Sequence, residues 1–189
     1  MSSRMLVLYG TTDGQTRKIA RRLGETLRES GAEVDVADAA GRMPAPDPDA
    51  YDAVVVAASV HTGGYQRPVR RWVRAHAAAL DRRPTAFVSV CRGVLEHKPA
   101  VDDELKRIRE RFFTATGWHP ATVKVVAGAL PYTRYSWLKK RIMLRIVAKT
   151  TGDLDTRRDY EYTDWKDLEA FGRSFAADLA AAGRHPLAV

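Results

Sequence analysis

The residue types best suited to binding a phosphate lie together near the N-terminus, directly after a short apolar run. Their order is Gly10, Thr11, Thr12, Asp13, Gly14, Gln15 and Thr16. Where a strand is followed by a helix, backbone N–H groups and the positive end of the helix dipole attract an anion. The threonine hydroxyls add donors and Gly14 permits close backbone approach, while Asp13 is expected to cap the helix and to offer only its N–H. We therefore predict that residues 11–16 bind a phosphate group.

This loop differs from two common nucleotide-binding loops. It contains no lysine, so it is not a Walker loop, and it lacks the Gly-x-Gly-x-x-Gly spacing of dinucleotide sites. Its spacing, Thr-x-Asp-Gly-x-Thr, resembles the Ser/Thr-x-Thr-Gly-x-Thr loop with which flavodoxins bind the phosphate of FMN. The alternative is a hydroxyl-rich turn that caps a helix and binds no ligand.

Two further loops follow apolar runs and are expected to lie beside the flavin ring. The first supplies Ser59, Val60, His61, Thr62, Gly63 and Tyr65, and the second supplies Ser89, Val90, Cys91, Arg92 and Gly93. Tyr65 is expected to stack on the ring, or else to be a rim residue, and the second loop has no aromatic residue for the other face. That open face favours hydride transfer from a substrate. His61 is a candidate to bond the cofactor or handle a proton, whereas Cys91 is expected to be a small buried residue.

A strongly basic segment occurs later in the chain. Residues 132–149 include six basic residues and no acid, and the candidates for substrate or membrane contact are Arg134, Tyr135, Trp137, Lys139, Lys140, Arg141, Arg145 and Lys149. On a helix, several of these cations would lie beside an apolar arc, which is typical of binding to an anionic membrane surface. Carboxylates or a nucleic acid are alternative partners, and an ordinary helix with a solvated basic side is a further alternative.

Alternating apolar runs and amphipathic stretches predict the elements that position these loops. Strands are predicted at residues 5–9, 33–37, 53–58, 85–90 and 122–129, and helices at 15–30, 68–80, 99–116 and 163–182. The pattern predicts an α/β fold, a flavodoxin-like three-layer doubly wound domain whose five-stranded parallel sheet has the order 2-1-3-4-5. Residues 131–160 do not fit the alternation, so we predict a basic helical insert after the fifth strand, within one domain spanning 1–189.

Composition and charge exclude several classes of protein and of binding site. The chain has 189 residues and a formal net charge of +8, which favours anionic partners. A single cysteine excludes a disulfide framework and a cysteine-rich zinc site, and the histidines show no metal-ligand spacing, so no metal is expected. No apolar run reaches the roughly 18 residues of a membrane span.

Taken together, the chain resembles the family of flavodoxin-like, menaquinone-dependent protoporphyrinogen oxidases of bacterial haem synthesis. The most specific marks are residues 132–137, the apolar and basic stretch after them, residues 155–157 and residues 162–165. The resemblance implies FMN as cofactor, oxidation of protoporphyrinogen IX, and transfer of electrons to menaquinone or another quinone. It also implies a cytoplasmic protein attached peripherally to the inner face of the cell membrane. No nucleic-acid partner is expected, and a homo-oligomer is left open.

The resemblance leaves several roles unassigned. Arg92, Arg134, His61 and the basic residues of the insert are candidates for contact with the substrate, whose two propionates would suit cations. No residue is identified as a general base. The competing interpretations are an NAD(P)H-dependent quinone reductase, a flavodoxin-type electron carrier, and a basic domain that binds nucleic acid without a cofactor.

Overall fold

The sheet has the predicted order. The computed structural model describes residues 2–91, 98–130, 132–134 and 155–183. Five parallel strands pair in the order β2-β1-β3-β4-β5. Their bounds are Arg4–Gly10 for β1, Glu33–Asp38 for β2, Ala53–Ser59 for β3, Thr85–Cys91 for β4 and Thr122–Ala127 for β5. The order 2-1-3-4-5 and the flavodoxin-like architecture are therefore confirmed.

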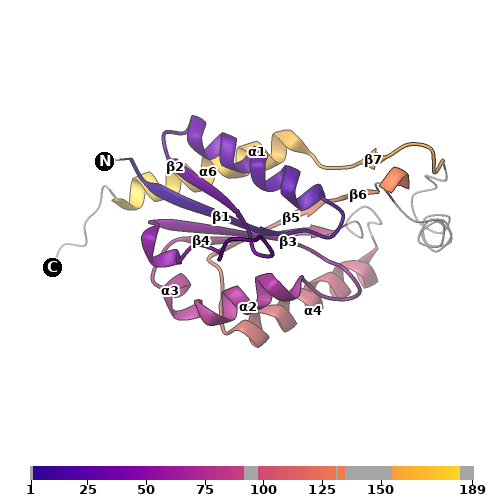
Figure 1. Cartoon of the computed structure of the whole chain (residues 1–189), viewed down its shortest axis with the longest axis horizontal. Helices are drawn as coiled ribbons and strands as arrows, with labels where there is room; N and C mark the ends of the chain where they lie inside the picture. The colour runs from indigo at the N-terminus through magenta and orange to yellow at the C-terminus, as the bar shows by residue number, and fades with distance from the viewer. Residues whose placement is uncertain (1, 92–97, 131, 135–154, 184–189) are drawn as a thin grey trace.

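Helices cover both faces of this sheet (Figure 1). Helices α1 (Gln15–Glu29) and α6 (Trp165–Gly183) pack on one face. Helices α2 (Arg67–Ala75), α3 (Ala77–Asp81) and α4 (Pro99–Thr116) pack on the other, and a short 3-10 helix η1 (Pro48–Ala50) precedes β3. Strand β3 is apolar because it is buried on both sides: Val55 packs towards α1 and α6, whereas Val54 and Val56 pack towards α2 and α4.

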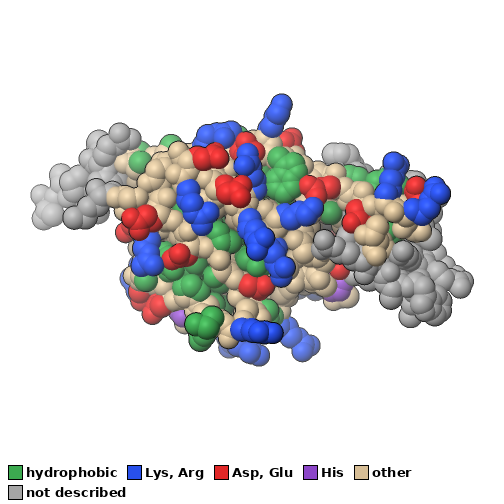
Figure 2. All heavy atoms as spheres, turned by 45° about the horizontal axis from the view of Figure 1, so that its top comes forward, with side chains coloured by type: hydrophobic (Ala, Val, Ile, Leu, Met, Phe, Trp, Pro, Cys, Tyr) green, Lys and Arg blue, Asp and Glu red, His purple; other side chains and the backbone are tan. Residues whose placement is uncertain are grey.

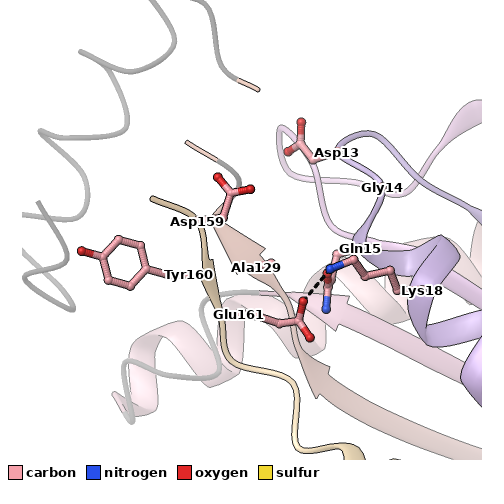
Figure 3. Close-up of a pocket in the computed structure, with 8 residues that line it drawn as sticks. All are labelled: Asp13, Gly14, Gln15, Lys18, Ala129, Asp159, Tyr160 and Glu161. Atoms are coloured by element: carbon pink, nitrogen blue, oxygen red, sulfur yellow. Dashed lines mark hydrogen bonds and ion pairs between the residues drawn. The ribbon is translucent and has the colours of Figure 1, made fainter. Parts of the chain in front are cut away.

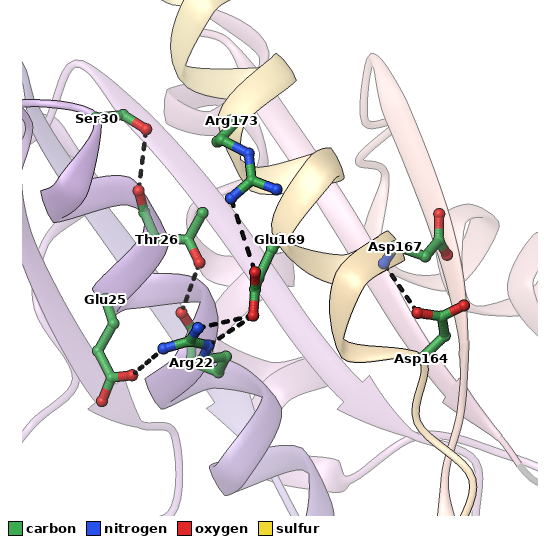
Figure 4. Close-up of polar contacts among 8 residues, drawn as sticks. All are labelled: Arg22, Glu25, Thr26, Ser30, Asp164, Asp167, Glu169 and Arg173. Carbon is green, nitrogen blue, oxygen red and sulfur yellow. Dashed lines mark hydrogen bonds and ion pairs between the residues drawn. The ribbon is translucent and has the colours of Figure 1, made fainter.

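Helices α1 and α6 lie in close contact with each other. A Cβ on Gly172 of α6 would lie 2.8 Å from Leu23 Cδ1 of α1, so only glycine allows this approach. Beside it, the guanidinium of Arg22 donates to Glu169 Oε1 through Nε at 2.9 Å and Nη2 at 2.7 Å (Figure 4). This pairing lowers the pKa of Glu169 and raises that of Arg22. The helix that carries the first loop therefore has a second helix packed along it.

Two element boundaries differ from the sequence prediction. The helix predicted at 68–80 is two helices, because His76 (φ −118°, ψ 15°) leaves the helical region and its ring Nδ1 lies 2.8 Å from the Trp72 carbonyl oxygen. The strand predicted at 122–129 ends at Ala127, and Ala129–Leu130 forms a separate strand β6. Strand β6 pairs antiparallel with β7 (Tyr160–Glu161), a two-stranded sheet that the sequence analysis missed. The bounds of the insert and the single-domain division remain predictions.

Candidate functional site

The three strands that precede the predicted site loops end at one edge of the sheet, where the strand order reverses. Strands β1 and β3 are neighbours, and in their register Gly10 lies opposite Ala58. In the next pair, Ser59 lies opposite Val90. The loops after β1, β3 and β4 therefore begin at the same carboxyl edge, which is where ligands bind in open α/β sheets.

The first loop turns into α1 through a glycine. Gly14 occupies the N-cap position with φ 95°, in the left-handed region, and its N–H donates to Thr11 Oγ1 at 2.9 Å. The prediction that Asp13 caps the helix is therefore wrong by one residue. The left-handed turn needs glycine, and among the described residues no side chain makes a capping hydrogen bond to the start of α1. The first turn of α1 contains no acidic residue, so nothing in that turn opposes an anion at the helix N-terminus.

Thr16, in the first turn of α1, provides the clearest sign of a ligand. Its side chain is 1% exposed, and its Oγ1 has no hydrogen-bond partner among the described residues. A buried hydroxyl without a partner costs roughly 1–3 kcal/mol, so the site is complete only when an acceptor or donor reaches it. A phosphate oxygen at the helix N-terminus would satisfy it. The loop therefore fits the phosphate of FMN.

The side chain of Gln15 is hydrogen-bonded within the domain. Its Nε2 donates to Thr163 Oγ1 at 2.9 Å, and that hydroxyl donates to the Ala127 carbonyl oxygen at 2.8 Å. The side chain thus connects the first loop to the end of β5 and to the residues that precede α6. The predicted contact of Gln15 with the cofactor stays a prediction.

The second loop is a tight turn on the same edge. The N–H of Val60 donates to the Val90 carbonyl oxygen at 2.8 Å, and His61 and Gly64 exchange backbone bonds of 2.8 and 3.2 Å. Between them, Thr62 (φ 47°) and Gly63 (φ 74°) both adopt positive φ. His61, Thr62 and Gly63 are exposed at the tip of this turn. Their predicted contact with a flavin stays a prediction.

Tyr65 packs into the domain below the turn. Its ring meets Phe87 at a centroid distance of 5.0 Å and Phe112 at 5.1 Å, both edge to face. Its hydroxyl lies 2.7 Å from Ser89 Oγ. Burial raises the pKa of Tyr65 to about 12, although the Ser89 bond acts in the opposite direction. Two phenylalanines already contact this ring, an arrangement that favours the alternative of a rim residue over stacking on a flavin.

The third loop begins in the core. Ser89, Val90 and Cys91 are buried in β4, in agreement with the expectation that Cys91 is a small buried residue. Their predicted cofactor contacts stay predictions. Arg92 and Gly93 lie outside the described residues.

Replacing Tyr65 by Phe should lower the free energy of unfolding by about 1 kcal/mol at pH 7, because Ser89 loses its buried partner. The pKa of Tyr65 rises from 10.0 to about 12 on folding, so the neutral phenol is favoured in the folded state. The wild-type chain should therefore lose roughly 1–2 kcal/mol between pH 10 and 12 that the variant does not lose. Urea unfolding at pH 7, 10 and 12 measures both effects. Equal losses in the two proteins above pH 10 would contradict this assignment.

A small cavity of about 40 Å³ separates the first loop from the base of the insert (Figure 3). Lys18 of α1 and Glu161 of β7 point toward one another across it, with Nζ and Oε2 2.8 Å apart, whereas Tyr160 points away. Glu161 also accepts from Trp165 Nε1 at 2.9 Å. Strand β7 is therefore bonded to the helix that follows the first loop, a connection that no sequence pattern indicated.

The described part of the insert is its base. Tyr132 is fully buried in the 3-10 helix η3 (Tyr132–Arg134), and Thr133 bonds Asp159 through N at 2.9 Å and Oγ1 at 3.0 Å. The backbone of Arg134 belongs to η3, but its side chain and the other predicted contact residues lie outside the description. Those residues are Tyr135, Trp137, Lys139, Lys140, Arg141, Arg145 and Lys149. In the described ranges, no group of three or more His, Cys, Asp or Glu could hold a metal ion.

The sequence is similar to a flavodoxin domain model and to named relatives of one kind. A family model described as a flavodoxin domain matches residues 6–157. The chain is 37% identical over 173 residues to a protein of Escherichia coli K12 named protoporphyrinogen IX dehydrogenase (quinone), covering 90% of this chain and 93% of that one. A Leishmania major protein of the same name is 33% identical over 182 residues, covering 93% of this chain and 76% of that one.

Solved structures agree on the fold. A flavodoxin from Streptococcus pneumoniae TIGR4 has a TM-score of 0.53 at 20% identity, covering 95% of this chain and 99% of that one. A short-chain flavodoxin associated with a bacterial microcompartment has a TM-score of 0.56 at 14% identity, covering 96% and 99%. At such low identities these structures show the fold alone.

Proposed function

This chain belongs to the flavodoxin family and, within it, to the protoporphyrinogen IX dehydrogenases (quinone), and on that basis we propose that it oxidises protoporphyrinogen IX with FMN as cofactor and a quinone as electron acceptor. The observation that carries the proposal is the extent of the match to the Escherichia coli relative. The matched region covers 90% of this chain, so it includes at least part of residues 131–160. A minimal five-strand domain does not need these residues.

FMN, when bound, supplies the redox chemistry, and the chain supplies binding and orientation. The hydroxyl of Thr16, the left-handed turn at Gly14 and the N-terminus of α1 would hold its phosphate. The turn from His61 to Gly64 lies at the same edge of the sheet, and its contact with the ring is part of this proposal. In this proposal uncharged hydrogen-bond donors bind the FMN phosphate, because residues 11–16 include no lysine.

We further propose that basic residues hold the two propionates of the substrate. Arginine pairs well with carboxylates because its guanidinium can donate two parallel hydrogen bonds. Arg92 and Arg134 are the first of the candidates, since Arg92 directly follows β4 and Arg134 is the last residue of η3, at the base of the insert.

Peripheral attachment to an anionic membrane surface is also proposed. Quinones with long isoprenoid tails, such as menaquinone, reside in lipid, so the enzyme must reach the bilayer. On the face shown in Figure 2, Lys and Arg side chains stand among Asp and Glu side chains rather than in one positive field. Residues 132–149, by contrast, contain six basic residues and no acid. Among the described residues no helix is long and apolar enough to cross a bilayer.

An anaerobic turnover assay tests the function. The purified protein, loaded with FMN, is mixed with protoporphyrinogen IX and a soluble menaquinone analogue, and the fluorescence of protoporphyrin IX is followed. We expect porphyrin to form only when both quinone and FMN are present. Porphyrin formation that needs no quinone, or rapid quinone reduction by NADPH without porphyrinogen, would contradict the proposal and favour another class of flavoprotein.

A further inference from the structure

Gln66 contacts the first two loops of the site, and no prediction assigned it a role. It is the N-cap residue of α2 and directly follows the second loop. Its Nε2 donates to Ser59 Oγ at 2.6 Å and to Thr12 Oγ1 at 3.1 Å, and its Oε1 accepts from the Ser59 N–H at 3.2 Å. One carboxamide therefore joins the loop after β1 to the end of β3.

The orientation of this carboxamide is fixed by its neighbours. The backbone N–H of Ser59 can only donate, so the atom facing it must be Oε1. The Nε2 group, which can only donate, is then left to face the two hydroxyls. The carboxamide also packs closely against the backbone of Gly10, where an ideal Cβ would lie 3.2 Å from Gln66 Oε1.

This orientation determines what the hydroxyl of Thr12 can do. A hydroxyl has one hydrogen to donate and two lone pairs that accept. Since Thr12 Oγ1 accepts from Gln66, its own hydrogen remains available for an acceptor in front of the loop. Thr12 is exposed there, at the loop that precedes the N-terminus of α1. A phosphate offers only acceptors under most conditions, so it needs hydroxyls set in this way.

We propose that Gln66 is a positioning residue that sets the Thr12 hydroxyl as a donor to the phosphate of the bound flavin. The proposal rests on the proposed function, because it presumes FMN at this edge of the sheet. It assigns to Gln66 a share of the preference for FMN over riboflavin, which lacks the phosphate. A residue that only supported the fold would change the affinities for both flavins alike.

The test replaces Gln66 by Glu, which has nearly the same shape but accepts where Nε2 donates. Thr12 and Ser59 would then donate to the new carboxylate, whose charge also repels the phosphate. We expect the dissociation constant for FMN to rise roughly a hundredfold, because one charge-assisted hydrogen bond to the phosphate is lost and a charge repulsion is added. The dissociation constant for riboflavin should rise less than about threefold, because riboflavin has no phosphate. Gln66→Leu, which neither donates nor accepts, should raise the constant for FMN roughly tenfold.

Two comparisons separate positioning from folding. Tyr51→Phe removes a 2.7 Å hydrogen bond to Asp35 at the opposite edge of the sheet, and it should leave the ratio of the two affinities unchanged. Thr12→Val should itself lower the preference for FMN, and adding the uncharged Gln66→Leu to it should lower that preference by much less than in the wild-type background. Thermal unfolding of each variant checks that the fold is retained.

The outcomes are distinct. Wild-type protein that prefers FMN to riboflavin, together with a Gln66→Glu variant that keeps the same preference, would overturn this inference alone. Equal losses for both flavins would also overturn it, since they indicate a structural role. Wild-type protein that binds neither flavin would overturn the proposed function and this inference with it.

Discussion

Valine in place of Gly14 is expected to raise the dissociation constant for FMN roughly a hundredfold. Gly14 has φ 95°, a conformation that β-branched residues avoid at a cost of about 1–2 kcal/mol. The new side chain would also stand at the N-terminus of α1, where the phosphate must approach the backbone. Quenching of FMN fluorescence by the purified variant measures the change.

Gly31 offers a matched control for this variant. It also has positive φ, at 92°, but it follows the other end of α1, and an added Cβ there meets nothing within 4 Å. Gly31→Val should therefore lower the thermal stability to a similar extent and leave the FMN affinity unchanged. If Gly14→Val bound FMN as tightly as Gly31→Val, the first loop would not be the phosphate site.

Removing the charge of the basic segment is expected to release the protein from anionic vesicles. The variant replaces Lys139, Lys140, Arg141 and Arg145 by Gln. Each basic residue near such a surface contributes about 1 kcal/mol, so the binding constant should fall at least roughly a hundredfold. Co-sedimentation with vesicles of phosphatidylserine and phosphatidylcholine measures it, and FMN binding should persist because the phosphate loop is untouched.

The control variant loses the same amount of charge from α4. It replaces Lys106, Arg107, Arg109 and Arg111 by Gln. Because two of these residues are already paired with Glu104, and because α4 carries acids among its bases, vesicle binding should fall only slightly. Equal losses in the two variants would mean that net charge, not the segment, governs binding. Loss of FMN with unchanged vesicle binding would reverse the assignment.

The sheet could be predicted because its signals are local. Strand β3 is a continuous apolar run, whereas β2 alternates polar and apolar residues. The buried sides of β3 explain why Ala53–Ser59 shows no polar alternation. The strands β6 and β7 could not be predicted, since two-residue strands leave no periodicity. Their pairing depends on residues about thirty positions apart, Ala129 with Glu161.

The candidate site was predictable in part for similar reasons. The hydroxyls and Gly14 form a contiguous motif, so the position of the phosphate loop followed from residue types. Gln66 was missed because its function depends on two hydroxyls from separate loops. The capping role given to Asp13 was wrong because the left-handed conformation of Gly14 places the start of α1 one residue later.

The most direct test of the account is the absorption spectrum of the FMN-loaded protein under anaerobic conditions. We predict that protoporphyrinogen IX, added without quinone, bleaches the yellow band of the bound flavin, and that an excess of a menaquinone analogue then restores this band as the porphyrin bands appear. A reconstituted protein with no flavin band, or a bound flavin whose spectrum does not respond to the porphyrinogen, would contradict the account.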